Sequence, residues 1–565
     1  MAVRPGDSHF EETVLRWFDE ADSEYDSHGS DQEFEDHMSE HSHVGSEMSS
    51  SDNEDENEDT TVQESGVSIK GKNGHRWSSV PPSRTRTLQR NLVLRIPGPK
   101  GAAKSISTEL EGWKLLVSDG IINKIVLHTN SEIGRKKMNY TENCGYVGET
   151  DTTELLALFG LLYISGCRKD NHLTTAEMWS KYGPEIYRSI MSETRFRFLI
   201  SCIRFDDKTA RNREDKFSPI REIWEEFESN CTKYYTPHEY VTIDEQLLGF
   251  RGNCPFRVYI ASKPDKYGLK IVTMCDSRTF YMVSAIPYIG KEVRANAEPL
   301  PHYYVKKLSE SIHGTGRNIT MDNWFTSIPL ADNMVNNYNL TIVGTLRKNK
   351  KEVPSSFLAN KNKEALTSQF AFDQKKTLVS FTPKKSKCVL LLSTMHNTKT
   401  VDPNKKPEII NFYNSTKGGV DTFDQMVHTY SVSRKTRRWP LRYFYGILDQ
   451  AGVNSGVLFQ MVKRNREKCI RRHYLFELGM QLARPHMERR LTKNLTKKLS
   501  SSIRTILGME EENIAAVPPP PKLAKQTRCA LCPRIKDIKT KTACSKCHKP
   551  VCNTHRVEIC SECNQ

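Results

Sequence analysis

Three short segments carry carboxylates in a pattern that suggests metal chemistry. YVTIDEQLLGFRG contains Asp244, NITMDNWFTS contains Asp322, and KGGVDTFDQM contains Asp421 and Asp424. Asp244 and Asp322 each follow a short run of β-favouring residues, so each is expected at the end of a strand. Asp421 and Asp424 are three residues apart in a predicted helix and therefore share a face. Carboxylates placed in this way can converge in one cleft although they lie far apart in the sequence.

Carboxylate oxygens are hard ligands of the kind that Mg²⁺ prefers. Two such ions about 3.5–4 Å apart can serve in-line displacement at a phosphodiester, one activating a water or 3′-OH and the other stabilising the leaving oxygen. We expect Asp244 to bridge the two ions. Asp322 and Asp421 would each hold one ion, with Asp424 in support, and Mn²⁺ is the alternative metal. A single Asp at a strand end is more often a cap or turn former, so the prediction depends on all three segments together.

The elements around these carboxylates predict an α/β catalytic domain at residues 240–430. Strand-like runs at 240–244, 267–275 and 280–287 precede a helix at 303–312, a strand at 318–321, a helix opening at 327–329 and a strand at 341–346. Three strands, a helix, a strand, a helix and a strand is the order of a ribonuclease-H-like core. Residues from about 350 to 410 lean towards β-structure, and we expect them to form an inserted subdomain.

The remaining sequence predicts a multidomain chain. Helical patterns at 107–239 and 431–507 flank the catalytic domain, and a linker at 508–528 leads to a cysteine-rich domain at 529–565. Residues 1–106 are expected to be disordered, acidic at first and then basic. The first 60 residues hold 20 Asp and Glu against two Arg, whereas the rest of the chain has a net charge of +33. A body this basic indicates a polyanionic partner, most simply nucleic acid.

Hydropathy and cysteine usage argue against a membrane or disulfide-rich protein. The longest apolar run, 155–164, is too short to cross a bilayer and is expected to be a buried helix capped by Asp151, with Glu154 three residues on. Seven of the 15 cysteines lie between Cys529 and Cys563, and the others are scattered singly. This distribution suits a reducing compartment and one metal-binding module.

The cysteine-rich segment has four ligand pairs, each with two residues between its members, which is a strong signal for two tetrahedral Zn²⁺ sites. We expect a cross-brace in which one ion is bound by Cys529, Cys532, Cys552 and His555 and the other by Cys544, Cys547, Cys560 and Cys563. A segment of under 40 residues cannot be held together by burial, so zinc would be its core. DNA binding, histone binding and ubiquitin ligation all remain open for this domain.

Basic side chains after the last catalytic helix and after the strand at 341–346 are candidate DNA contacts. The first group is Arg434, Lys435, Arg437, Arg438 and Trp439, and the second is Arg347, Lys348 and Lys350. Cations bind backbone phosphate and an indole can stack on an unpaired base. The alternatives are a solvated basic turn with Trp439 packed in the core, and a lysine-rich surface loop. Weaker candidates are Arg251, Arg257 and Lys263.

Long stretches of the sequence resemble the piggyBac transposases. They include LLGFRGNCPFRVYI, NITMDNWFTSIPLA, TIVGTLRKNKKEVP, YNSTKGGVDTFDQM and SRKTRRWP, and the resemblance runs from about residue 110 to the C-terminus. The family uses Asp at the positions that match Asp244, Asp322, Asp421 and Asp424. The resemblance implies cut-and-paste transposition with hairpinned ends, insertion at TTAA, a homodimer, and a helical dimerisation and DNA-binding domain built from both flanking segments. It also favours recognition of the terminal inverted repeats by the zinc domain. A nuclear location is expected from basic residues near the zinc ligands, which are candidates for part of a nuclear import signal: Lys522, Lys525, Arg528, Arg534 and Lys536.

Three functions fit these features. The first is an active DNA transposase, and the second is a host-adapted, non-cleaving, sequence-specific DNA-binding protein derived from one. The presence of all four carboxylates favours the first, because a pure binding protein has no use for them. The third is a zinc-dependent ubiquitin ligase, which is disfavoured because the ligand order differs from the usual RING order.

Overall fold

A computed structural model describes residues 67–82, 93, 95–140, 145–261, 263–290, 298–359, 362–463, 470–509, 522–544 and 548–555. The chain divides into two compact units, residues 1–490 and 491–565, and each is described by itself. The expected disorder of the acidic segment 1–60 and residues 510–521 of the expected linker lie outside the described residues.

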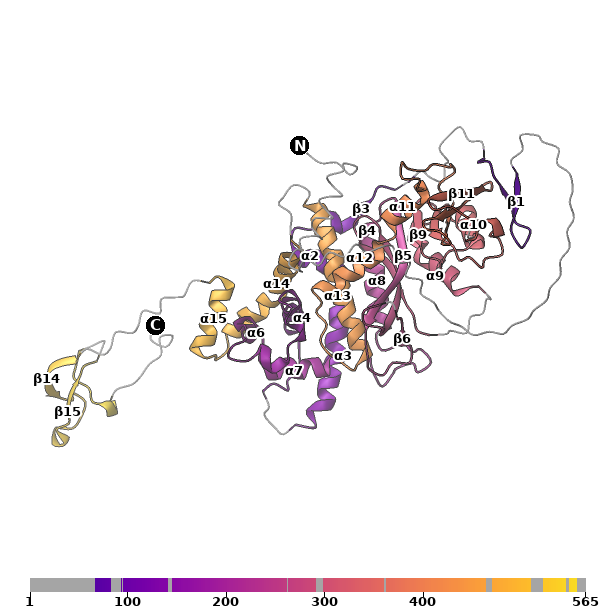
Figure 1. The fold of residues 1–565 in the computed structure, drawn as a ribbon. Helices are drawn as coiled ribbons and strands as arrows, with labels where there is room; N and C mark the ends of the chain where they lie inside the picture. The colour runs from indigo at the N-terminus through magenta and orange to yellow at the C-terminus, as the bar shows by residue number, and fades with distance from the viewer. Residues whose placement is uncertain are drawn as a thin grey trace. The chain divides into compact units, whose positions relative to one another are not determined.

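A large mixed β-sheet forms the centre of the first unit (Figure 1). Its middle strands are β5 (Tyr240–Gly249), β7 (Tyr267–Asp276), β8 (Met282–Pro287), β9 (Asn318–Met321) and β10 (Thr341–Thr345), with the two-residue β6 (Val258–Tyr259) at one edge. β5, β7 and β8 are antiparallel neighbours, whereas β9 pairs parallel with both β5 and β10. Helices α9 (Leu300–Leu308) and α10 (Ile328–Asn337) separate β8, β9 and β10 in sequence. The order predicted for a ribonuclease-H-like core is therefore present.

β5 differs from its predicted form. We expected a short strand ending at Asp244, but β5 continues to Gly249 because its antiparallel pairing with β7 runs through Asp244 opposite Thr273. The parallel pairing with β9 is shorter and ends at Ile243 opposite Met321. Asp244 is therefore in the middle of a strand, at the first position beyond the end of its parallel neighbour.

The segment at 350–410, which we expected to form an inserted β-rich subdomain, contributes its strands to the main sheet. Its strands β11 (Thr367–Phe372), β12 (Thr377–Thr382) and β13 (Val389–Ser393) extend the main sheet, with β13 antiparallel to β10. Helix α11 (Glu408–Thr416) then packs on β10 and β13. The apolar side chains of β12 and β13 are buried against this helix, so the segment shares the core of the catalytic sheet.

A hairpin within the region expected to be disordered also joins the sheet. Strands β1 (Ser68–Lys70) and β2 (Arg76–Ser78) pair with each other, and β2 pairs with β11. Trp77 is buried, and its indole N–H donates to the carbonyl of Glu352 at 2.9 Å. Disorder was the wrong expectation for this part of 1–106, because one buried tryptophan anchors the hairpin to the catalytic sheet.

Helices before and after the sheet form one body. They are α2 (Glu109–Leu116), α3 (Asp119–Lys137), α4 (Thr152–Cys167), α5 (Thr175–Met178), α6 (Glu185–Ile190), α7 (Glu193–Cys202) and α8 (Arg221–Tyr234), followed later by α12 (Gly419–Thr429), α13 (Trp439–Val462) and α14 (Arg471–Leu491). α4 is the predicted buried helix, and the side chain of Asp151 accepts a hydrogen bond from the Glu154 amide as expected. Among the described residues, no helix is long and apolar enough to cross a membrane.

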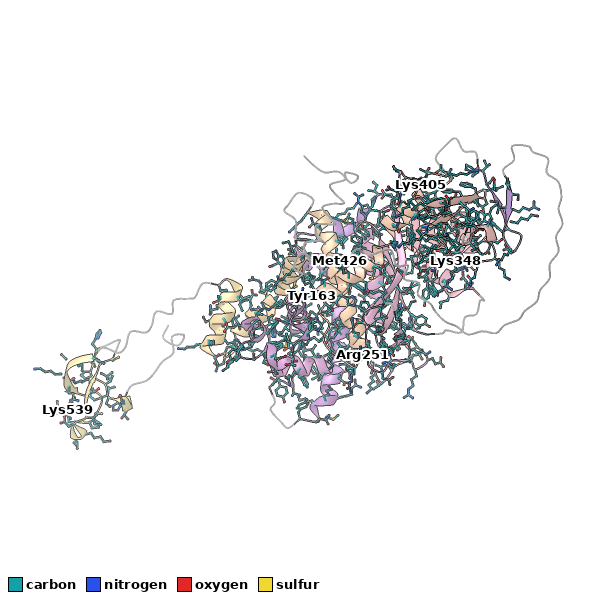
Figure 2. All side chains as sticks on the ribbon, viewed as in Figure 1. Tyr163, Arg251, Lys348, Lys405, Met426 and Lys539 are labelled. Atoms are coloured by element: carbon teal, nitrogen blue, oxygen red, sulfur yellow. The ribbon has the colours of Figure 1, made fainter. Side chains whose placement is uncertain are left out.

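Tight contacts join the early and late helices. Tyr163 of α4 lies within the helical body (Figure 2). Its hydroxyl donates to the carbonyl of Leu448 on α13 at 2.5 Å and accepts from the Trp113 indole at 2.8 Å. At the crossing of α4 and α14, a Cβ added to Gly160 would lie 2.4 Å from the carbonyl oxygen of Gly479. Segments about 300 residues apart in sequence are therefore packed as one helical body.

The second unit contains α15 (Lys497–Leu507), a hairpin of β14 (Lys522–Arg528) and β15 (Lys539–Thr542), and the 3-10 turn Asn553–His555. β14 falls within residues 508–528, which were expected to be only a linker, because it pairs with β15. α15 belongs to this unit, although the sequence assigned it to the second helical part.

Candidate active site and comparisons with known proteins

Asp244 and Asp322 are neighbours because their strands are parallel. Ile243 and Met321 form the last pair of the β5–β9 ladder, and each is followed directly by one of the two aspartates. The Asp322 side chain accepts the amide of Trp324 at 2.8 Å, which holds the turn after β9 in place. Asp244 Oδ1 accepts the amide of Glu245 at 2.8 Å. The two aspartates therefore lie side by side where the parallel pairing of β5 and β9 ends.

Hydrogen bonds of threonine hydroxyls hold α11 against the sheet and thereby fix the position at which α12 begins. Thr242 on β5 donates to the carbonyl of Thr416 at 2.6 Å, and the hydroxyls of Thr320 and Thr416 are 2.8 Å apart. α12 follows at once and packs on β5 and β7. A Cβ on Gly419 would lie 2.5 Å from the Thr242 hydroxyl oxygen, so only glycine allows this approach. The first turn of α12, which carries Asp421, is thereby brought to Asp244.

The electrostatics of the site indicate four acidic groups in one place. Burial raises the pKa of Asp244 well above its usual value, and the nearby charges of Glu245, Asp322 and Asp421 raise it further. Burial, followed by Glu245, raises the pKa of Asp322. Burial also raises the pKa of Asp424, although His428 and Lys263 oppose the shift. Raised pKa values caused by burial and by neighbouring acids are typical of carboxylates that share a functional site.

Asp424 supplies a test of whether a metal fits. Its buried Oδ1 has no hydrogen-bond partner among the described residues, although the Gln246 side chain acts on the same carboxyl group, and Nδ1 of His428 lies 3.5 Å from it. A buried carboxylate oxygen without a hydrogen bond is costly unless a cation is supplied. The donors around it are carboxylate oxygens, which suit Mg²⁺ or Mn²⁺. The residues present therefore fit a divalent metal.

Lys263 is part of this cluster. Its Nζ lies 3.2 Å from Oδ1 of Asp421, and its side chain is only 18% exposed. The sequence suggested it only as a weak DNA contact, because nothing near it in sequence marks it as an active-site residue. Gln246 was also missed, although its position two residues after Asp244 on a strand puts both on one face. Its Oε1 accepts from Gln450 of α13 at 2.8 Å, which ties β5 to the helical body.

The second unit brings together four of the predicted zinc ligands. One ligand atom from each of Cys529, Cys532, Cys552 and His555 lies within 4.8 Å of all the others. The sulfurs of Cys532 and Cys552 are 3.7 Å apart, and His555 Nδ1 is 3.4 Å from each of them. With Zn–S bonds of about 2.3 Å, the edges of a tetrahedral site are expected to be about 3.7 Å. Of the other expected ligands Cys544 is described, whereas Cys547, Cys560 and Cys563 lie outside the described residues.

In the basic loop after α12, some side chains pack within the chain and others are exposed. Arg434 donates to the carbonyl of Leu173 at 2.8 Å, and Arg438 donates to those of Ile200 at 3.1 Å and Ile203. Burial lowers the pKa of Arg438 to about 10, and the Arg204 charge adds to the fall.

Trp439 also packs within the chain. Its ring stacks on Phe217 at 6.0 Å between centroids and meets Phe256 edge-on at 5.0 Å. The structure therefore gives Arg434, Arg438 and Trp439 packing roles, whereas Lys435 and Arg437 are exposed.

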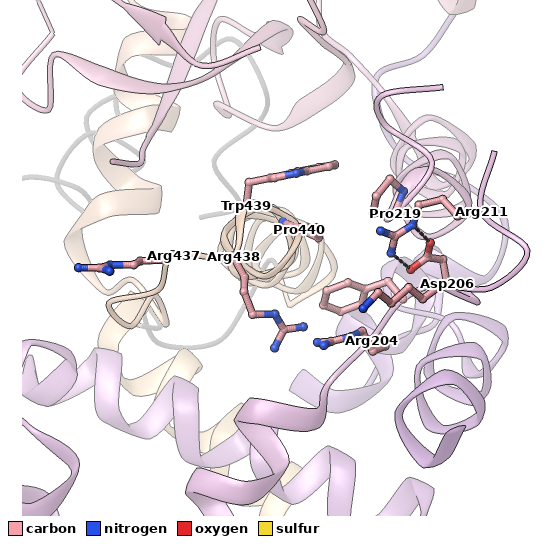
Figure 3. A pocket seen from close by; sticks show the side chains of 10 residues that line it. Arg204, Asp206, Arg211, Pro219, Arg437, Arg438, Trp439 and Pro440 are labelled. Carbon is pink, nitrogen blue, oxygen red and sulfur yellow. Dashed lines mark hydrogen bonds and ion pairs between the residues drawn. The ribbon is translucent and has the colours of Figure 1, made fainter. Parts of the chain in front are cut away.

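A basic pocket of about 270 Å³ lies beside this loop (Figure 3). Its lining includes Arg204, Lys208, Arg211, Arg438 and Trp439. The Arg211 guanidinium is paired with Asp206 at 2.6 Å, and Arg437 points away from the other labelled side chains. Near the acidic cluster, the exposed Arg347 donates to Asn323, the residue after Asp322, at 3.3 Å, and the half-buried Lys350 lies in the same turn.

Comparisons with known proteins agree with this arrangement. A family model described as Transposase IS4 matches residues 108–456. The human PiggyBac transposable element-derived protein 3 is 24% identical over 515 residues, which cover 83% of this chain and 81% of the relative. The human chimeric ERCC6-PGBD3 protein is also 24% identical, but the match covers 45% of its length. A cryo-EM structure of the piggyBac transposase synaptic complex with hairpin DNA matches with a TM-score of 0.71 and 39% identity, over 83% of this chain and 100% of that one. The chain therefore belongs to the piggyBac-type family of transposases.

Proposed function

We propose that the chain is a DNA transposase that cuts transposon ends, forms and opens hairpins, and joins the ends to TTAA target sites. The observation that carries the proposal is the convergence of Asp244, Asp322, Asp421 and Asp424 from two parallel strands and one helix. When bound, two Mg²⁺ ions would activate the attacking oxygen and stabilise the leaving oxygen. The solved relative was captured with hairpin DNA, which supports the choice of substrate.

The proposed roles follow from position. The charges of both Asp322 and Asp421 act on Asp244, which would bridge the ions, while Asp322 and Asp421 would each hold one. Asp424 is more buried than Asp421 and would complete the site from the next position on the same helix face. Arg347 and Lys350 lie in the turn beside Asp322 and would hold target DNA.

The exposed Lys435 and Arg437, together with the basic pocket, would bind the phosphates of the transposon end. The cysteine–histidine cluster would hold structural Zn²⁺ and present its exposed lysines to terminal-repeat DNA. A homodimer acting in the nucleus completes the proposal.

A cleavage assay tests this function. Purified protein is incubated with a hairpin-ended DNA that ends in TTAA, with Mg²⁺ or with EDTA. Metal-dependent opening of the hairpin supports the proposal. Tight DNA binding without any hairpin opening in Mg²⁺ or Mn²⁺ would instead identify a non-cleaving DNA-binding protein. This is the second candidate function, because a human relative is described as transposable element-derived.

A further inference from the structure

The ion pair between Lys263 and Asp421 joins a largely buried cation to an exposed carboxylate. The Asp421 side chain is 64% exposed, whereas the Lys263 side chain that reaches it is only 18% exposed. The Lys263 ammonium lies among carboxylates, and its electrostatic partners include Asp244 and Asp424 as well as Asp421. A buried ammonium needs such compensation.

The β6–β7 connection places this side chain. The amide of Ile260 donates to the carbonyl of Lys266 at 2.7 Å, and the amide of Lys266 donates to that of Lys263 at 3.1 Å. These bonds close a tight turn whose inner lysine reaches α12. Lys266, in the same turn, is exposed and has no ion pair among the described residues. The position of Lys263 is therefore specific and does not follow from a generally basic loop.

Lys263 supplies one positive charge to the carboxylate cluster in the absence of metal, because its ammonium lies 3.2 Å from Oδ1 of Asp421. The neighbouring Glu245 is served by a different lysine, Lys270, at 3.5 Å. A divalent metal bound to the same carboxylates would repel the ammonium at short range. The four-carbon stem of lysine lets the ammonium move while the backbone stays in place.

We propose that Lys263 is an exchangeable cation of the active site, which neutralises the carboxylates before metal binds and moves to a DNA phosphate when metal displaces it. This inference rests on the proposed function, because it assumes that Asp421 is a metal ligand. The inference predicts two properties of the Lys263 side chain. Lys263 should compete with metal in the free protein, and it should contribute to DNA binding only when metal is present.

The test compares Lys263→Gln with Lys266→Gln, which removes the same charge from the same turn. Binding of Mn²⁺ to the full chain without DNA is measured by electron paramagnetic resonance. Affinity for hairpin-ended DNA is measured in EDTA and in Ca²⁺, with intact substrate verified. Lys263→Gln should tighten Mn²⁺ binding by roughly fivefold or more. It should leave DNA affinity in EDTA unchanged and weaken it in Ca²⁺ by roughly tenfold. Lys266→Gln should change none of these values, and Lys263→Arg should keep the Ca²⁺-dependent DNA affinity.

Unchanged or weaker Mn²⁺ binding by Lys263→Gln overturns the proposal. Tighter metal binding without the Ca²⁺-dependent loss of DNA affinity overturns it as well, because the displaced ammonium would then have no phosphate partner. Asp421→Asn separates this failure from a failure of the proposed function. If that variant binds Mn²⁺ as well as the unchanged protein does, the carboxylate cluster is not the metal site. A thermal melt in EDTA verifies that each variant is folded.

Discussion

The carboxylate cluster and the cysteine–histidine cluster are both candidate metal sites, but different parts of the fold support them. Asp244 and Asp322 follow Ile243 and Met321, which are buried in the sheet core. Around Cys529 and Cys552, the strands β14 and β15 contain no buried residue. In the first site the hydrophobic core positions the side chains, and metal would be needed only for chemistry. In the second site the ligands are expected to take the place of a core.

The largest expected effect is the loss of cleavage when a carboxylate is removed. Asp244→Asn, Asp322→Asn or Asp421→Asn should each reduce strand cleavage to below about 1% of the unchanged protein, because metal-ion stabilisation of the reacting oxygens is lost. Binding to transposon ends should persist, since lysine and arginine contacts to phosphate supply the affinity. Single-turnover cleavage and gel-shift assays measure both, with the exposed Asp119→Asn on α3 as the control. Cleavage above that level in all three variants contradicts the assignment.

Removing a ligand from the cysteine–histidine cluster should have the opposite effect, because folding of the cluster should be lost while hairpin opening by the catalytic unit is kept. Cys552→Ala should release one zinc ion and unfold residues 529–555, because structural zinc supplies about 10 kcal/mol or more to such modules. The catalytic unit should stay folded, and opening of a hairpin substrate should survive while excision from intact ends fails.

Metal analysis by mass spectrometry and circular dichroism measure the loss of zinc and of structure. Cys254→Ala is the control, because this half-buried cysteine lies in the other unit. Normal excision by the metal-free module would remove DNA recognition as its role and favour a protein-binding role.

A backbone variant tests how strictly the fold positions Asp421. Gly419→Ala puts a Cβ 2.5 Å from the Thr242 hydroxyl oxygen and should push the first turn of α12 away from β5. We expect cleavage to fall by roughly 10- to 100-fold, because misplacement by about 1 Å has this effect on catalysis. Gly418→Ala is the matched control, since its nearest neighbour would be at an ordinary 3.7 Å. Equal rates for the two variants would show that the approach of α12 to β5 is not rate-determining.

The smallest effect concerns stability without metal. A carboxyl whose pKa is raised by folding binds more protons in the folded state, so the stability it supports is lost as pH rises through that raised pKa. Burial and neighbouring acids raise the pKa of Asp244, so its charge should destabilise the metal-free protein at neutral pH. Asp244→Asn should then increase the Tm in EDTA at pH 7 by on the order of 2 °C, and by less at pH 5. A lower Tm at pH 7 would show that the cluster is already balanced, for instance by Lys263.

Local signals in the sequence predicted much of the catalytic core. β9 occurs at the predicted residues, and Asp151 and Ser327 cap the helices that were expected to begin there. The ligand spacing of the cysteine-rich segment predicted which four side chains meet in the structure. These features depend on short-range chemistry, which a sequence displays directly.

The features that the sequence did not predict depend on contacts between residues far apart in the chain. The extension of the sheet by β11 to β13 and by the hairpin of Trp77 depends on partners far away in sequence. The sequence also left open whether Trp439 binds DNA or packs, and only the positions of Phe217 and Phe256 show that it packs. Lys263 reaches Asp421 across 158 residues, and no local pattern marks it.

The most direct test of the metal-dependent active site is to locate the metal. Crystals of the protein with hairpin-ended DNA and Mn²⁺, measured at the manganese absorption edge, give the number and positions of the ions. We predict two anomalous peaks about 3.5–4 Å apart, held by Asp244, Asp322 and Asp421 with Asp424 beside them. Manganese bound elsewhere, together with undiminished hairpin opening by Asp244→Asn, would contradict the account.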